Sequence, residues 1–246
     1  MTTNEILQKC TIEGNIVKLP SIKLERKEYL DVAKQLNLIG GMWKGGKIQG
    51  FIFNEDPTDL LAQIANGEKR NIKKEFQFFA TPDKLADRLV ELAEIEYSHS
   101  VLEPSAGQGN IVKAIHREFP AISVFGYELI EVNKTFLNKI HNFKLLGSDF
   151  LTECDTCFDR IIANPPFSMN QDIDHIMRMY KHLNTGGRIV TVASQHWQLA
   201  SGKKEMNFRG WLSDVGAHII ELESGTFKES GTNVKTTIII IDKHGT

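Results

Sequence analysis

Residues 100–109 have the sequence SVLEPSAGQG, and this stretch decides the fold. A short apolar run ends at Glu103 and leads into a loop that carries Gly107 and Gly109. Glycines there let the backbone approach a ligand closely, and a helix that begins near Asn110 would present unpaired N–H groups to a carboxylate. A strand, a glycine loop and a helix in this order predict the ligand-binding turn of a parallel sheet.

The same pattern also fits a dinucleotide-binding fold, so the loop alone does not identify the ligand. Two details argue against a dinucleotide: Val112 stands where its third glycine would lie, and the loop has no basic residue for a pyrophosphate. Glu103, at the end of the strand, points in the same direction.

The chain on both sides of this loop alternates helical patterns with short apolar runs, as in a parallel sheet covered by helices. One helix should start at Thr81, as N-cap, with Pro82 in its first turn. Further strands are expected at 122–127, 143–146, 160–163 and 188–192. The last two, 218–221 and 234–242, are separated by a polar connection instead of a helix, which predicts an antiparallel pair that closes the sheet.

A second motif, Asn164-Pro165-Pro166-Phe167, follows the expected strand 160–163. An amine on a purine ring is a poor nucleophile because its lone pair is delocalised. If the Asn164 side-chain oxygen and the Pro165 carbonyl each accept one of its N–H groups, the lone pair is freed. The two prolines stiffen the backbone, and Phe167 offers a flat face to a base. This motif predicts methyl transfer to a planar amine.

Together these segments resemble the class I S-adenosylmethionine-dependent methyltransferases, in particular the DNA adenine N6-methyltransferases whose cofactor motifs precede the catalytic one. The resemblance covers residues 76–242. It implies an α/β, Rossmann-like fold whose seven-stranded sheet has an antiparallel last strand. It also implies S-adenosyl-L-methionine as cofactor, DNA as substrate, and Asn164, Pro165, Pro166 and Phe167 as the catalytic residues.

The resemblance further implies a set of cofactor contacts. The glycine loop would hold the methionine part, Glu128 the ribose hydroxyls and Asp149 the adenine amine, while Phe150 packs on the adenine ring. Upstream, Phe79 would lie near the sulfonium and Thr81 near the methionine carboxylate. The complete expected set is Phe79, Thr81, Glu103, Ser105, Gly107, Gly109, Glu128, Asp149, Phe150 and Asn164.

The target base is expected between two aromatic rings, Phe167 and Phe227. The alternative for Phe227 is an apolar residue that fixes its loop to the sheet. His196 and Trp197 follow the fifth strand. Either both line the mouth of the pocket, or His196 lies at the surface and Trp197 in the core.

Residues 1–75 are expected to form a small α+β accessory unit, and residues 76–246 the methyltransferase domain. The unit should contain a helix at 24–38, a hairpin turning at Gly45-Gly46 and a helix at 58–65. It either contacts the substrate or buries Trp43, with its other aromatic residues, in a core of its own.

The composition sets outer bounds on function. A net charge of −2 and a pI near 6.5 give no global basic field, although Lys203, Lys204 and Arg209 cluster late in the chain, where a solvated face is the simplest interpretation. No apolar run is long enough to span a bilayer, so we expect a soluble, cytoplasmic protein. Cys154 and Cys157 have metal or redox spacing, but no second ligand pair lies nearby, so no metal is predicted.

Three functions remain open at this stage. DNA adenine N6 methylation is favoured; methylation of RNA adenine or of a protein glutamine amide uses the same motif, and a catalytically silent binding subunit is a third reading. The sequence stops at Thr246, shortly after the last expected strand, where sequence-specific relatives carry a recognition region. Specificity would then come from the N-terminal unit, from the connection 195–216 or from a partner, or the enzyme would accept many sequence contexts.

Overall fold

The computed structural model describes residues 1–53, 56–67, 80–228 and 234–245. The chain divides into two compact units, Met1–Phe78 and Phe79–Thr246, whereas the sequence places the division after residue 75.

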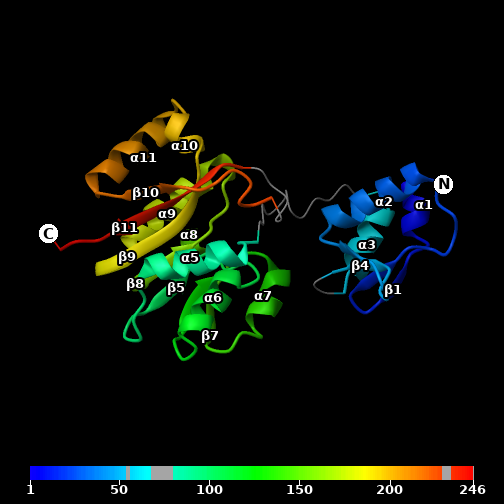
Figure 1. Cartoon of the computed structure of the whole chain (residues 1–246), viewed down its shortest axis with the longest axis horizontal. Coiled ribbons are helices and arrows are strands. Elements are labelled where there is room, and N and C mark those ends of the chain that lie inside the picture. The colour runs from blue at the N-terminus through cyan, green and yellow to red at the C-terminus, as the bar shows by residue number, and fades with distance from the viewer. Residues whose placement is uncertain (54–55, 68–79, 229–233, 246) are drawn as a thin grey trace. The chain divides into compact units, whose positions relative to one another are not determined.

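The described part of the N-terminal unit combines three helices with a four-stranded antiparallel sheet in the order β1-β2-β4-β3 (Figure 1). Phe51 and Phe53 are buried in its core, as one reading of the sequence expected, but Trp43 is 46% exposed. The elements are α1 (Thr3–Leu7), β1 (Thr11–Glu13), β2 (Ile16–Lys18), α2 (Arg26–Leu38), β3 (Met42–Lys44), β4 (Gly50–Ile52) and α3 (Thr58–Ala65).

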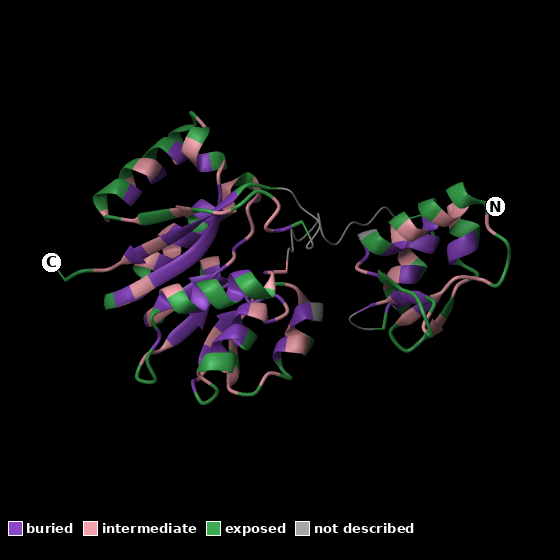
Figure 2. Ribbon diagram, in the orientation of Figure 1, coloured by how far each residue is buried: buried purple, intermediate pink, exposed green. Residues whose placement is uncertain are grey.

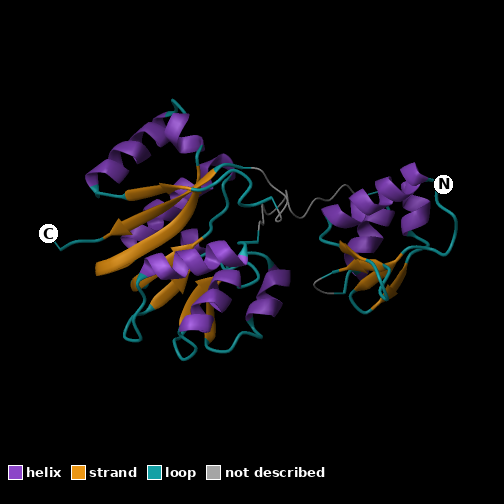
Figure 3. Cartoon of the chain, in the orientation of Figure 1, coloured by secondary structure: helices purple, strands orange, loops and turns teal. Residues whose placement is uncertain are grey.

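The second unit is built on a seven-stranded sheet in the order β10-β11-β9-β8-β5-β6-β7, with helices on both faces (Figures 1 and 3). Its strands are β5 (Val101–Glu103), β6 (Val124–Tyr127), β7 (Phe143–Gly147), β8 (Phe158–Ala163), β9 (Leu183–Ser194), β10 (His218–Glu221) and β11 (Thr236–Asp242). Its helices are α5 (Asp83–Ala93), α6 (Asn110–Glu118), α7 (Glu131–Leu137), α8 (Phe150–Glu153), η1 (Ser168–Asn170), α9 (Gln171–Lys181), α10 (His196–Leu199) and α11 (Lys203–Asp214).

Strands β5 to β9 run parallel, and β11 lies antiparallel between β9 and β10. This confirms the prediction of a class I methyltransferase fold with an antiparallel last strand.

Alternation along the strands gives the sheet two apolar cores, one on each face (Figure 2). One core packs α5 and α6 against residues such as Val101 and Val190, and the other packs α9 and α11 against neighbours such as Leu102 and Ile189. Because both faces are covered, loops at the strand ends are left to carry binding groups.

One helix boundary differs from the expectation. The N-cap of α5 is Pro82, not Thr81, and Pro82 has no side chain that can cap. The hydroxyl of Thr81 instead accepts a hydrogen bond from Asn164, so a long-range contact takes the place of the local one.

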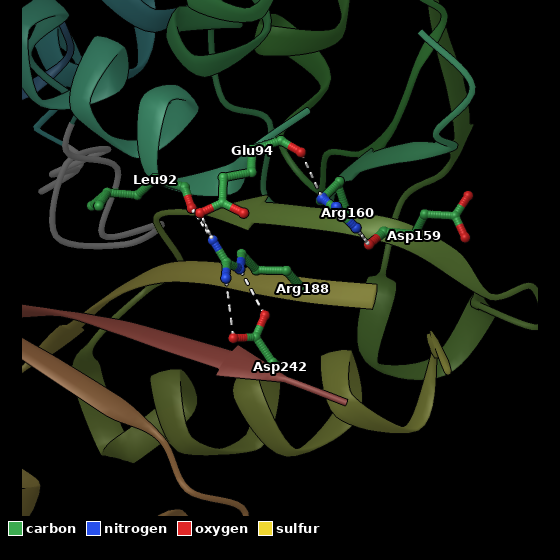
Figure 4. Close-up of polar contacts among 6 residues, drawn as sticks. All are labelled: Leu92, Glu94, Asp159, Arg160, Arg188 and Asp242. Atoms are coloured by element: carbon green, nitrogen blue, oxygen red, sulfur yellow. Dashed lines mark hydrogen bonds and ion pairs between the residues drawn. The ribbon is translucent and has the colours of Figure 1, made fainter. Parts of the chain in front are cut away.

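The amino ends of β8 and β9 meet the carboxyl end of β11 in a charged cluster (Figure 4). Arg188 binds both oxygens of Asp242 and also the carboxylate of Glu94, with Nε to Oδ1 and Nη1 to Oε1 distances of 2.6 Å each. Arg160 donates to the backbone carbonyls of Glu94 and Asp159. These contacts fasten the end of α5 to the sheet. No helix in the described part of the chain is long and apolar enough to cross a membrane.

Candidate active site

The glycine loop after β5 needs glycine for two physical reasons. Gly107 and Gly109 have φ angles of +54° and +78°, in the left-handed region that side chains disfavour. A Cβ at Gly109 would also lie 2.4 Å from Cδ1 of Ile140. Gly109 is the N-cap of α6, so the loop leads directly into a helix N-terminus, as the sequence predicts.

Glu128, at the end of β6, is 6% exposed and organises this loop. Its carboxylate accepts hydrogen bonds from Gly107 N at 2.6 Å, from Ile130 N at 2.7 Å and from Asn133 Nδ2 at 3.2 Å. Burial raises its pKa, while these N–H groups act in the opposite direction. A carboxylate offers about four lone pairs, so it retains capacity for a further donor such as a ribose hydroxyl.

Glu103, at the end of β5, is a second buried carboxyl, 1% exposed. Ser105 N donates to it at 3.2 Å. Burial, with a further contribution from the charge of Glu128, raises the pKa of Glu103 to about 8. Two carboxyls so placed favour a ligand that brings positive charge or hydroxyl donors.

Thr81 joins the glycine-loop side of the site to the Asn-Pro-Pro-Phe motif. Its hydroxyl accepts from Asn164 Nδ2 at 3.1 Å, and its carbonyl accepts from Asn110 Nδ2 at 2.8 Å. Asn110 is the first residue of α6, so Thr81 lies between that helix and the end of β8. Phe79, the other residue predicted from this segment, lies outside the described residues.

The motif residues Asn164, Pro165, Pro166 and Phe167 follow β8 directly and have no regular secondary structure. Phe167 is half-buried and meets Phe227 edge to face, with ring centroids 6.3 Å apart. Phe227 is fully buried in the core. The two predicted aromatic residues therefore do meet, but Phe227 is buried in the core, as the alternative interpretation of this residue predicted.

Asp149 and Phe150 follow β7, where the sequence places them, but both are already engaged by the protein. The Asp149 carboxylate caps α8 by accepting from Leu151 N at 2.9 Å and also accepts from Thr152 Oγ1. Phe150 is 1% exposed and its ring contacts Tyr127 and His175. The expectation that Phe150 packs on adenine is therefore not favoured: its ring belongs to the core.

The model of the methyltransferase small domain family matches residues 79–208. The chain belongs to this family.

Known proteins similar to this chain have names that refer to different substrates. Its sequence is 30% identical over 120 residues to the modification methylase CviBIII of Paramecium bursaria Chlorella virus NC1A, covering 45% of this chain and 32% of that protein. It is 27% identical over 97 residues to a protein of Methanosarcina acetivorans described as ribosomal RNA small subunit methyltransferase A, covering 39% of this chain and 36% of that protein. The matched regions thus span about a third of these relatives.

Among solved structures, a Listeria monocytogenes protein described as a class I S-adenosylmethionine-dependent methyltransferase shares the fold. Its TM-score is 0.57 at 15% identity, covering 76% of this chain and 67% of that one. Members of the family use S-adenosylmethionine as cofactor.

The residues of this chain fit that cofactor. S-adenosylmethionine carries two cationic groups and a ribose diol, which suit the buried carboxyls of Glu103 and Glu128. The left-handed Gly107 and Gly109 keep the loop free of side chains beside them. Ser105 lies at the same loop, with its hydroxyl 3.4 Å from His175 Nδ1.

Sequence reasoning missed several polar residues of the methyltransferase. His175 is 7% exposed, and burial lowers its pKa to about 4. Asp172 is 1% exposed and accepts from Ser194 N at 2.9 Å and Ser194 Oγ at 2.8 Å, which ties α9 to the end of β9. Burial raises the pKa of Asp172. Both lie on α9 among apolar residues at helical spacing. That spacing is the one signal in the sequence that could have predicted their burial.

The remaining candidates have structural positions. Trp197 is buried and packs edge to face on Phe208, while His196 is exposed, as one reading of the sequence expected. Cys154 is buried and Cys157 exposed. Within the described ranges no group of three His, Cys, Asp or Glu residues could hold a metal ion.

Proposed function

We propose that this chain transfers a methyl group from S-adenosylmethionine to the N6 amine of adenine in DNA. The observation that carries the proposal is the Asn164-Pro165-Pro166-Phe167 segment at the end of β8, joined through Thr81 to the N-terminus of α6. Similarity to a modification methylase supports the assignment.

S-adenosylmethionine would supply the methyl group: the amine lone pair forms the N–C bond, the C–S bond breaks with its electron pair left on sulfur, and one proton passes from the nitrogen to water. The protein has to orient the amine and free its lone pair.

The hydrogen bond between Asn164 and Thr81 supports this role for Asn164. Because Nδ2 donates to Thr81, the amide turns its oxygen end away from Thr81, as an acceptor for one N–H of the amine. The Pro165 carbonyl accepts the other. Pro165 and Pro166 have no N–H to compete, and each has a restricted φ, so both acceptors stay in place. Phe167, supported by Phe227, stacks against the base.

A second candidate is methylation of adenine in RNA. The similarity to a protein described as a ribosomal RNA methyltransferase favours it over other substrates. The acceptor geometry of the motif serves an adenine amine in either nucleic acid, so only the substrate separates the two candidates.

Recognition of the target is proposed to involve the N-terminal unit or a specificity partner. Trp43 is 46% exposed on a hairpin that also carries the exposed Lys44 and Lys47. An exposed indole with adjacent lysines suits stacking on a base beside a phosphate. Trp43→Ala should therefore weaken DNA binding about fivefold to a hundredfold without changing cofactor affinity.

The test is transfer of labelled methyl from S-adenosylmethionine to unmethylated DNA, with total RNA and protein in parallel and nucleosides identified by mass. Asn164→Ala should lower the rate by about a thousandfold. Asn184→Ala is the matched control, since Asn184 bonds Asp159 at the opposite edge of the sheet.

N6-methyldeoxyadenosine that is lost only in Asn164→Ala supports the proposal. Label in RNA alone would replace the substrate, and label in protein alone would point to a glutamine amide. No label in any substrate, with cofactor still bound, would favour a silent subunit.

A further inference from the structure

Two apolar side chains are unusually exposed to solvent for a domain whose core is covered on both faces. Met169 is 83% exposed and Leu199 is 92% exposed, the highest values among large apolar residues in the described part of the chain. Both follow strands of the site: Met169 comes shortly after the β8 motif, and Leu199 closes α10 after β9. Because β8 and β9 are parallel neighbours, both residues lie at the carboxyl edge.

The turn that carries Met169 is held in an unfavourable backbone conformation. Met169 and Asn170 have φ angles of +51° and +59°, both left-handed although neither residue is glycine. Such a conformation persists only where surrounding contacts enforce it, and these occur together at functional sites.

Those contacts come from α11. Asn170 Nδ2 donates to Glu205 Oε1 at 2.7 Å, and Lys204 Nζ donates to the Asn170 carbonyl at 3.0 Å. The same Lys204 pairs with Asp174 at 2.7 Å. The turn is thus fixed from both its side chain and its backbone.

The Leu199 segment is fixed by the same helix. Arg209 Nη1 donates to the carbonyls of Trp197 and Ala200, which lie on either side of Leu199. Glu205 Oε1 also lies 3.7 Å from His196 Nε2, so one carboxylate connects both segments. Lys204 and Arg209, which the sequence marks as a basic cluster, therefore hold in place the two segments that carry Met169 and Leu199.

We propose that Met169 and Leu199 form an apolar wedge that inserts into duplex DNA beside the target adenine and fills the space that the extruded base leaves. This inference rests on the proposed function. A base inside a duplex cannot reach Asn164 unless it leaves the stack, and apolar side chains placed between base steps compensate for lost stacking. Because Lys204 pairs with Asp174, the charge of that carboxylate is compensated and does not repel phosphate.

The test compares one adenine-containing strand in two forms, fully paired and single-stranded, with wild type and the double variant Met169→Ala/Leu199→Ala. The wedge is needed only when a pair must be opened. Methylation of the duplex should fall about tenfold or more, and methylation of the single strand should change less than about twofold. Affinity for S-adenosylmethionine, measured by calorimetry, should be unchanged.

Two controls separate shape from chemistry. The exchange Met169→Leu/Leu199→Met keeps apolar volume at both tips and should retain duplex activity. Leu146→Ala removes an exposed aliphatic side chain from β7, at the far side of the sheet, and should leave both rates unchanged.

The outcomes distinguish this inference from the function on which it rests. A wild type that methylates no nucleic acid overturns both. A wild type that methylates only unpaired adenine, or a double variant that loses both substrates equally or loses neither, overturns the wedge and leaves the methyltransferase assignment standing.

Discussion

The two ends of the parallel strands in the large sheet use polar residues in opposite ways; we call these ends the amino edge and the carboxyl edge. At the amino edge, Arg188 is matched by Asp242 and Glu94 (Figure 4). Although burial raises the pKa of Asp159, hydrogen bonds from Ser100 and Asn184 hold it below its usual value. At the carboxyl edge, burial raises the pKa of Glu103 and Glu128.

The difference shows which edge was shaped for stability and which for a ligand. Charges at the amino edge are satisfied within the protein. The carboxyl edge holds carboxyls in an environment that disfavours their ionised form, a cost that a bound cation would offset.

The largest effect on activity is expected from a substitution of Thr81 at the carboxyl edge. Thr81→Val keeps the shape but removes the acceptor for Asn164, so we expect kcat to fall about a hundredfold. Thr81→Ser restores the hydroxyl and should restore most of the rate. Steady-state kinetics and cofactor calorimetry separate the roles: a change in cofactor affinity with kcat intact would instead assign Thr81 to the cofactor.

The raised pKa of Glu103 should make stability depend on pH. Because its folded pKa of about 8 exceeds the unfolded value of 4.5, its stabilising contribution is complete below pH 4.5 and is lost as pH rises toward 8. Between pH 5 and 8 the wild type should lose about 3.5 kcal/mol relative to Glu103→Gln. Urea unfolding at several pH values measures this; parallel curves for the two proteins would contradict it.

A glycine with a left-handed φ occurs at each edge, so the same substitution can be compared at both. Gly109→Ala should destabilise by about 1.5 kcal/mol, since it combines a left-handed φ with contact to Ile140. Gly186, near the amino end of β9, has a similar φ of +80° but open space around its Cβ. Gly186→Ala should cost less, and equal thermal shifts for both variants would show that crowding by Ile140 is unimportant.

The smallest effect is expected at the amino edge. Arg188→Met removes the pairs with Asp242 and Glu94, both partly exposed, so the loss should be about 1 kcal/mol after solvent screening. Methyl transfer per folded molecule should stay unchanged, because no residue of the site contacts this cluster through an identified hydrogen bond in the described ranges. A large loss of activity with stability intact would mean that the edges are coupled.

Much of the large unit could be predicted because its signals are local. The glycine loop and the antiparallel pairing of β10 with β11 appear where the sequence places them, and in the N-terminal unit so does the helix over Thr58–Ala65. Local signals were overlooked in the N-terminal unit: α1, with its Thr2 capping box, and the β1–β2 hairpin around Gly14-Asn15 were not predicted.

Other features could not be predicted because they depend on distant contacts. Thr81 looks like a helix cap until Asn164, from another strand, takes its hydroxyl. Lys204 and Arg209 look like a solvated basic face, yet both bind backbone carbonyls of neighbouring segments. Spacing identifies which residue types meet at the site, whereas burial and partners decide their roles.

The position of β11 also bears on how the chain is made. It pairs with β9 on one side and β10 on the other, although it is the last of the three to be synthesised. Until it leaves the ribosome, the apolar strand β9 has one open edge, which invites pairing with other chains. Translation that stalls after β10 would therefore release a chain prone to aggregation, and pairing of the final strand is the step that completes the sheet.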